Sequence, residues 1–131
     1  MKTVAVRLKP GVDLVKEIKR VCDENNIEAG VILSGVGGLS RAKIRVPVVG
    51  GKTKYIKPGN LEIVSLDGTV SKSGIHVHIS GSDTEGKVWG GHLKEGSIVR
   101  TTCELVIGIL PNTKFTREMD DDTSYDELKI S

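Results

Sequence analysis

Only one stretch of this 131-residue chain has the apolar spacing of an α-helix, and this feature limits the possible folds more than any other. Its apolar residues fall at positions i, i+1, i+4, i+7 and i+8, on one helical face: Leu14, Val15, Ile18, Val21 and Cys22. Asp13 is suited to cap the first turn, and Asn25-Asn26 to end the last. We therefore predict one main helix, from Asp13 to Asn25, packed on a sheet.

Most other apolar segments alternate apolar with polar or small residues, a pattern typical of half-buried strands. In KTVAVRL, for example, Val4, Val6 and Leu8 alternate in this way before Pro10-Gly11 ends the segment. The further candidate strands are EAGVILSGVGG, SRAKIRVPVV, LEIVSLDGTV, GIHVHIS, KVWGGHL and IVRTTCELVIGIL.

Glycine-rich and polar segments separate these candidate strands. We expect breaks in the chain at Gly37-Gly38 and at KEG, a hairpin connection at GSDTEG, and a loop in GGKTKYIKPGN. In the tail, the spacing of Tyr125, Leu128 and Ile130 predicts a last short strand or a packed extension.

One helix among about seven or eight strands predicts an α+β fold with a mostly antiparallel sheet. The length is that of one ordinary domain, so residues 1–131 are expected to form a single unit. The run from Leu105 to Leu110 is continuously apolar, which predicts a central strand covered on both faces. Pro47 indicates that its strand lies at an edge or is bent.

Composition argues against several other classes of protein. The chain is 37% apolar and 27% charged, as in an average globular domain, and no apolar run approaches the roughly 18 residues of a membrane span. Arg7 interrupts the N-terminal apolar run before it could serve as a signal-peptide core, so a cytoplasmic protein without membrane contact is expected. Cys22 and Cys103 lie outside any C-x-x-C pattern and are predicted to be free, buried thiols.

The glycine-rich segments do not form a nucleotide site. GGKT, from Gly50 to Thr53, resembles the end of a phosphate-binding loop, but Val46 stands where the first glycine is required and no helix follows. SGVGGLS lacks the spacing of a dinucleotide fingerprint and is followed by a strand. No nucleotide cofactor is expected.

Charge is unevenly distributed along the chain. One segment carries six bases and no acid: Arg41, Lys43, Arg45, Lys52, Lys54 and Lys57. Such a segment is either a solvated face or a surface that contacts the phosphates of DNA. From Glu118 to Glu127 the chain instead carries only acids among its charged residues. The few aromatic residues provide no ladder on which single-stranded bases would stack.

All three histidines of the chain lie between positions 76 and 92. On a strand, His76 and His78 project together from one face, while Ile75, Val77 and Ile79 face the core. Two imidazoles so placed can bind one transition metal, and the return strand of the hairpin would bring back a third ring.

That third ring is His92, from this subunit or a neighbouring one. The preceding Gly90-Gly91 would permit a bulge that re-aims it. Three nitrogens favour zinc, with nickel and copper as competitors and a fourth position left for water. The alternative is a set of solvent-facing or hydrogen-bonded rings. Glu104 is a candidate fourth ligand or hydrogen-bond acceptor for an imidazole N–H, although a simple salt bridge is the preferred interpretation.

An open metal site permits catalysis without requiring it, so a metal-dependent enzyme is an alternative to a non-catalytic binding module. A hydrolase built from Ser80, His78 and Asp83 is not supported, because no segment resembles a nucleophile elbow.

Several of these segments together resemble the PPC domain, named for its occurrence in plants and prokaryotes. The similarity runs through RLKPGVDLVKEIKRVCDENNIEAGVILSGVGGLSRAKI, LEIVSLDGTVS, HVHISGSDTEGKVWGGHL and CELVIG, and covers nearly the whole chain. The combination of H-x-H with a downstream G-G-H-L is the most specific part.

The resemblance implies an α+β fold with one helix on a mostly antiparallel sheet, and a homotrimer. It also implies a zinc site in some prokaryotic members at the positions of His76, His78 and His92. Plant relatives join the domain to an AT-hook that binds DNA, but this chain has no Arg-Gly-Arg-Pro stretch. The leading hypothesis is a homotrimeric binding module, and a DNA-associated regulator is the alternative.

Overall fold

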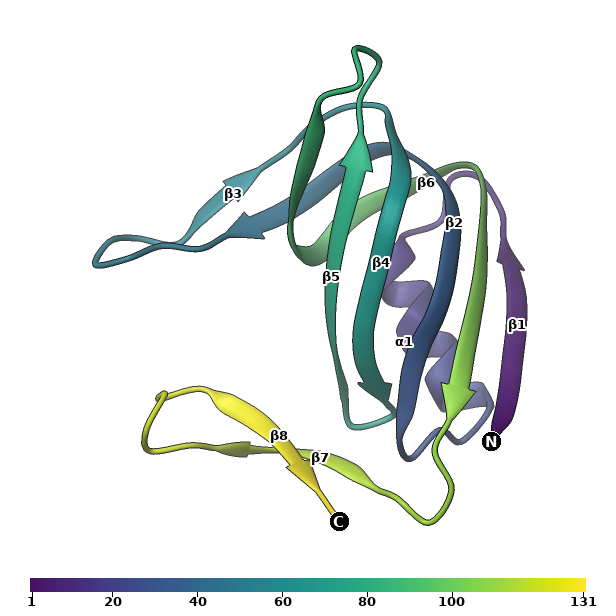
Figure 1. Ribbon diagram of the computed structural model, residues 1–131, viewed down its shortest axis with the longest axis vertical. Helices are drawn as coiled ribbons and strands as arrows, with labels where there is room; N and C mark the ends of the chain where they lie inside the picture. The colour runs from purple at the N-terminus through teal and green to yellow at the C-terminus, as the bar shows by residue number, and fades with distance from the viewer.

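The computed structural model describes residues 1–131 and contains one helix and eight strands (Figure 1). In chain order the elements are β1 (Lys2–Leu8), α1 (Leu14–Glu24), β2 (Gly30–Val46), β3 (Lys54–Ile56), β4 (Leu61–Ser71), β5 (Gly74–Ser82), β6 (Val88–Ile109), β7 (Phe115–Met119) and β8 (Asp126–Ile130). The predicted α+β class is confirmed.

The helix forms where its apolar stripe and its cap predict it. The Asp13 carboxylate accepts a hydrogen bond from the Lys16 backbone N–H at 3.2 Å, and Asn25 follows the last turn. All five apolar residues of the stripe are buried against the sheet. The helix is neither long enough nor apolar enough to cross a membrane.

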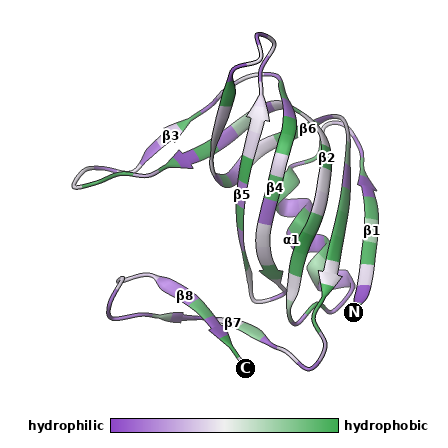
Figure 2. Ribbon diagram, viewed as in Figure 1, coloured by the Kyte–Doolittle hydropathy of each residue, from purple (hydrophilic) through white to green (hydrophobic).

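Six strands form one antiparallel sheet in the order β1-β6-β5-β4-β2-β3, with a further pairing between β6 and β2. The pairings β2–β4, β4–β5, β5–β6 and β6–β2 therefore close a circuit, so the sheet curls around the core. Figure 1 shows α1 packed behind this sheet, and Figure 2 shows polar and apolar patches along the strands.

The C-terminal half of β6 lies between β1 and β2, as its continuous apolar run predicts. Leu105 and Ile107 are buried there. The central position of this segment is thus confirmed.

Two predicted chain breaks were wrong. The segments before and after Gly37-Gly38 form one long strand, β2, and the segments before and after KEG form one long strand, β6. These two strands pair with each other over most of their length, and register shifts in β2 bend the ladder without ending it. At Gly37 the carbonyl oxygen of Thr102 lies only 2.0 Å from where a Cβ would stand, so only glycine fits this close crossing.

The segment predicted to be a loop also contains a strand. Residues 54–56 form β3, which pairs with the end of β2 and makes a two-stranded arm at the upper left of Figure 1. β2 ends at Val46, directly before Pro47, and β3 lies at the edge of the sheet.

The C-terminal tail forms a second, two-stranded sheet. β8 contains Leu128 and Ile130, as predicted, but its partner β7 was not foreseen. The Phe115 backbone N–H donates to the Glu28 carbonyl at 2.9 Å, and the Phe115 ring is buried, which anchors the hairpin to the main body. In Figure 1 this hairpin and the β2–β3 arm extend to the same side of the sheet.

Candidate metal site and adjoining cleft

The first two histidines project from β5 on the side away from the core. Val77 and Ile79 are buried, Ile75 is half-buried, and the alternating His76 and His78 are exposed. The predicted orientation of this strand is confirmed.

The third histidine returns across the β5–β6 hairpin and lies directly opposite the second, with His78 and His92 as register partners. Asp83 holds the turn of this hairpin. One of its carboxylate oxygens accepts backbone hydrogen bonds from Glu85 and Lys87, each at 2.9 Å, and the other accepts the Trp89 indole N–H at 3.0 Å. The predicted hairpin connection is therefore present.

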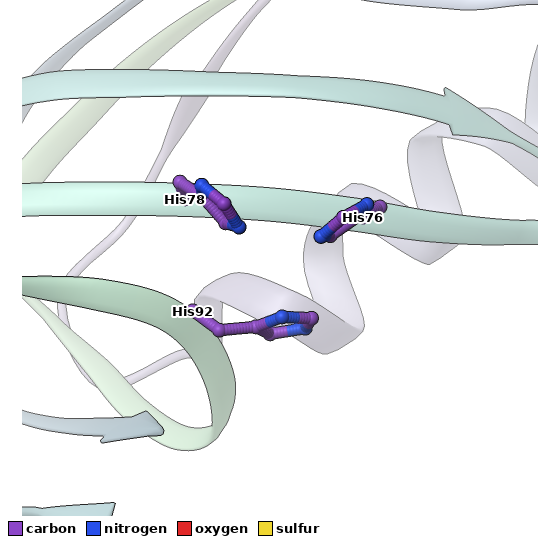
Figure 3. Close-up of side chains that lie close together, drawn as sticks. All are labelled: His76, His78 and His92. Carbon is purple, nitrogen blue, oxygen red and sulfur yellow. The ribbon is translucent and has the colours of Figure 1, made fainter. Parts of the chain in front are cut away.

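The three rings form a compact cluster, with two from β5 and one from β6 (Figure 3). The ring centroid of His76 lies 4.9 Å from that of His78 and 4.9 Å from that of His92. The centroids of His78 and His92 are 5.6 Å apart. One ring nitrogen from each histidine can serve as a ligand, and these three nitrogens lie within 4.8 Å of one another. This is the one group of three or more potential ligands within such a distance, and all three residues come from the same chain.

The glycines before His92 do not form the predicted bulge, since the β5–β6 register runs without a shift from His78 to Ser82. Gly91 is needed for a different reason. Its φ is +153°, and a Cβ there would lie 2.7 Å from the Arg45 carbonyl oxygen, so the residue lets β6 pass close to β2. His92 is consequently held next to Arg45.

The surroundings of the cluster favour neutral imidazoles. Burial, followed by the positive charges of Lys94 and Arg45, lowers the pKa of His92 to about 4. Burial and the neighbouring His78 and Arg117 also lower the pKa of His76. The neutral ring is the form that binds a metal.

Arg45 contacts the cluster directly. Its Nη2 lies 3.1 Å from His92 Nδ1. A guanidinium can only donate, so Nδ1 accepts and the proton of the neutral ring is on Nε2. In this tautomer neither nitrogen of His92 is free for a metal until Arg45 moves away.

A cleft of about 450 Å³ adjoins the cluster, between β5, β6 and the C-terminal hairpin. Its lining residues are Arg45, Ser73, Gly74, Ile75, His76, His92, Lys94, Arg117, Tyr125, Asp126 and Glu127. Sequence reasoning missed most of them, because nothing in the local pattern shows that the acidic tail folds back beside the histidines. The opposite charges of the tail and of the basic segment were the only available signal.

The remaining predicted residues are not brought to the cluster. Glu104 lies on β6 opposite Arg7 and Val36, is exposed, and forms no salt bridge within the chain. It is neither a ligand nor a hydrogen-bond acceptor for a ring here, because it does not join the ligand group.

The bases of the basic segment do not all share one face of the β2–β3 arm. Arg45 is opposite Tyr55 and next to His92, and Lys43 lies over the Tyr55 ring at 4.6 Å. Lys54 is paired with Val46 instead, at an alternate position of the ladder. The others, Arg41, Lys52 and Lys57, are exposed on β2 and around β3.

A curled antiparallel sheet with one helix behind it and a histidine cluster on its outer side defines a class of small α+β domains. Residues 1–111 match the family model of the Plants and Prokaryotes Conserved (PCC) domain, also abbreviated PPC. The chain belongs to this family, which confirms the resemblance found in the sequence.

Solved structures agree with this assignment. A hypothetical protein of Salmonella enterica is 36% identical, with a TM-score of 0.91 over 99% of this chain and 93% of that one. A metal-containing protein of Archaeoglobus fulgidus is 32% identical, with a TM-score of 0.82 over 98% of this chain and 94% of that one. A protein of Ralstonia eutropha provisionally named as DNA-binding has a TM-score of 0.83 over 97% and 90%, but its 19% identity shows only a shared fold.

The chain also matches a protein of Synechococcus named bifunctional protein GlmU, with 38% identity over 99% of this chain. It spans about a fifth of the length of the curated relatives it matches.

Proposed function

We propose that this chain is a homotrimeric binding module whose histidine cluster holds a metal ion, with zinc as the best fit. The observation that carries the proposal is the convergence of His76, His78 and His92, whose ligand nitrogens lie within 4.8 Å of one another.

The donor set fits zinc in chemistry and in scale. Zinc binds imidazole nitrogen at about 2.0–2.1 Å, so three ligands around one tetrahedral ion lie about 3.3 Å apart. To reach that spacing the rings must turn towards one another and Arg45 must leave His92 Nδ1. The name of the Archaeoglobus relative, which describes it as metal-containing, supports a bound metal without naming the element. A bound zinc ion would offer an open fourth position for a water or a ligand oxygen.

The trimer is supported by the apolar surface of the sheet. Leu33 and Val36 of β2 and Val64 of β4 are exposed to solvent on two strands that pair with each other, and a contact between chains would bury them. The β2–β3 arm and the β7–β8 hairpin project from the main sheet (Figure 1) and offer further surface for contacts with adjacent copies. The occupant of this surface is a second copy of the chain, as the family resemblance implies.

Elemental analysis and calorimetry of tag-free protein test the metal. We expect zinc to bind with one ion per chain and to raise the melting temperature, because a ligand that binds only the folded state stabilises it. The variant His76→Ala/His78→Ala should lose both effects. Ser80→Ala, the next outward-facing residue on the same strand, is the matched control and should retain them. Sub-stoichiometric metal that does not rise on zinc addition contradicts the proposal.

Light scattering tests the trimer. We expect three times the chain mass for the unaltered protein and a smaller mass for Val36→Glu, which places a charge in the apolar contact. Val88→Glu, at an exposed position beside the β5–β6 turn, should leave the mass unchanged. A monomer at all concentrations would refute the trimer.

DNA binding is the second candidate, and the basic segment does not form one continuous face for it, because Lys54 lies on the opposite face of the β2–β3 arm from Arg45. It predicts duplex binding that weakens steeply with salt. The absence of any mobility shift at low salt would remove it. Catalysis by the metal site would require turnover of a substrate in addition to metal binding.

A further inference from the structure

The cleft beside the histidines has an unusual distribution of charge. Arg45, Lys94 and Arg117 line one part of it, and none of the three forms an ion pair within the chain. Their positive charges are thus not neutralised by protein carboxylates.

Arg117 comes from the C-terminal hairpin but lies against the main sheet. Its Nη2 donates to Thr69 Oγ1 at 3.3 Å, and Thr69 is the register partner of His76. The hairpin therefore carries a guanidinium to the edge of the histidine cluster. The guanidinium still has free N–H groups, because only one of its five donors is occupied in this contact.

Two acidic residues of β8 also line the cleft. They are Asp126 and Glu127, and neither pairs with the three bases. Ile75 and Tyr125 supply apolar surface between the charged groups. Unpaired charges of both signs in one cleft favour a ligand that carries anionic groups together with hydrogen-bond donors.

We propose that this cleft binds a small organic acid that also carries hydroxyl or ammonium groups, with its carboxylate held by Arg45, Lys94 and Arg117. The volume of about 450 Å³ is in the range of small-molecule sites. Guanidinium groups bind a carboxylate through two parallel hydrogen bonds. Asp126 and Glu127 accept hydrogen bonds from the hydroxyl or ammonium groups of the ligand.

This inference deepens the proposed function and rests on it in one step only, the coupling between anion and metal. Arg45 contacts His92 Nδ1 at 3.1 Å, so a metal at His92 must displace the guanidinium. The displaced Arg45 is then free to bind the carboxylate. Metal and acid therefore increase each other's affinity by the same factor, as linkage requires.

Calorimetric titration of the metal-free chain with malate and succinate tests the cleft itself, since the two acids differ by one hydroxyl group. We expect saturable binding of malate and weaker binding of succinate. Arg117→Gln and Lys94→Gln should each weaken malate binding by about tenfold or more, because each removes a charge-assisted hydrogen bond. Arg100→Gln, at an exposed arginine outside the cleft, is the matched control and should change nothing.

The variant Asp126→Asn/Glu127→Gln probes the acidic residues of the lining. It should reduce the preference for malate over succinate, and it should improve the binding of inorganic phosphate. A melting curve shows whether each variant folds. If Arg117→Gln does not fold, Arg117→Lys, which retains the charge, takes its place in the titration. Wild-type protein that binds neither acid, or that binds phosphate more tightly than malate, overturns the proposal. Equal binding by Arg117→Gln, Lys94→Gln and Arg100→Gln overturns it as well.

A second titration separates this inference from the metal proposal. In protein loaded with one equivalent of zinc, malate should bind more tightly than in metal-free protein, and Arg45→Gln should abolish the difference. If zinc does not bind but malate does, the metal proposal fails and the cleft assignment stands. If zinc binds and malate does not, the cleft assignment fails alone.

Discussion

The carboxylate of Asp13 accepts a hydrogen bond from the backbone N–H of Gly96 at 2.8 Å, which joins the start of the only helix to the bend in β6. Its second oxygen accepts from Lys16 and caps α1. Gly96 has a φ of +103°, and it belongs to the KEG segment, where β6 bends. One side chain thus fixes both the helix and the long strand on which it packs.

Replacing Asp13 should therefore lower the free energy of unfolding by more than the loss of a helix cap alone. We expect Asp13→Ala to lower the free energy of unfolding by about 2 kcal/mol or more, at the upper end of cap substitutions, because the Gly96 N–H also loses its acceptor. Chemical denaturation measures this change. Asp13→Asn retains one acceptor oxygen and should lose about half as much, so an Asn variant as unstable as the Ala variant would contradict the two-bond account.

Gly91 is the second position where a single atom should matter. The variant Gly91→Ala should lose about 1–3 kcal/mol of stability, because a Cβ would meet the Arg45 carbonyl oxygen and the backbone has a φ of +153°. Gly86→Ala, with a φ of +81° and no atom within 4 Å of its Cβ, isolates the conformational part. Equal losses for the two variants would show that the contact with Arg45 is unimportant.

The two cysteines should be unreactive in the folded protein. Burial raises the pKa of Cys22 and of Cys103 to about 11, from an ordinary value of 9.0. The thiolate population at pH 8 is then about a hundredfold smaller than that of ordinary thiols. Mass spectrometry after iodoacetamide treatment should find no labelling at pH 8 in native buffer and complete labelling in guanidinium. Rapid native labelling of either residue would contradict its burial.

The C-terminal hairpin should be released by one core substitution. An isolated two-stranded hairpin is only marginally stable, and the Phe115 ring is the buried side chain of this one. We expect Phe115→Ala to lower the free energy of opening of β7 and β8 by about 3 kcal/mol, seen as faster hydrogen exchange in residues 115–130 with little change elsewhere. Met119→Ala, at an exposed position of β7, should leave exchange unchanged.

The sequence was sufficient for the elements that depend on local periodicity. The helical stripe ending at Cys22 predicted α1 to within one residue, and the alternation around Val77 predicted which way His76 and His78 point. The GSDTEG turn was enough to bring His92 back, because a hairpin connection fixes its own register.

Features that depend on partners distant in sequence were not predictable in the same way. The composition of Gly37-Gly38 and of KEG is that of a turn, yet both segments lie within strands because β2 and β6 pair across them. Likewise, nothing near Arg117 indicates that its hairpin folds back beside the histidines. That placement depends on the contact between Phe115 and Glu28.

The pairing of β1 with the end of β6 has a consequence for synthesis. Lys2 is the register partner of Ile109 and Leu8 that of Cys103, so the first strand has no partner in the sheet until β6 has been translated. β6 is also a partner of β2 over most of the length of β2. Because chains emerge from the ribosome N-terminus first, β1 must wait unpaired while β2 to β5 are made, and this long-range pairing is expected to slow the folding of the domain.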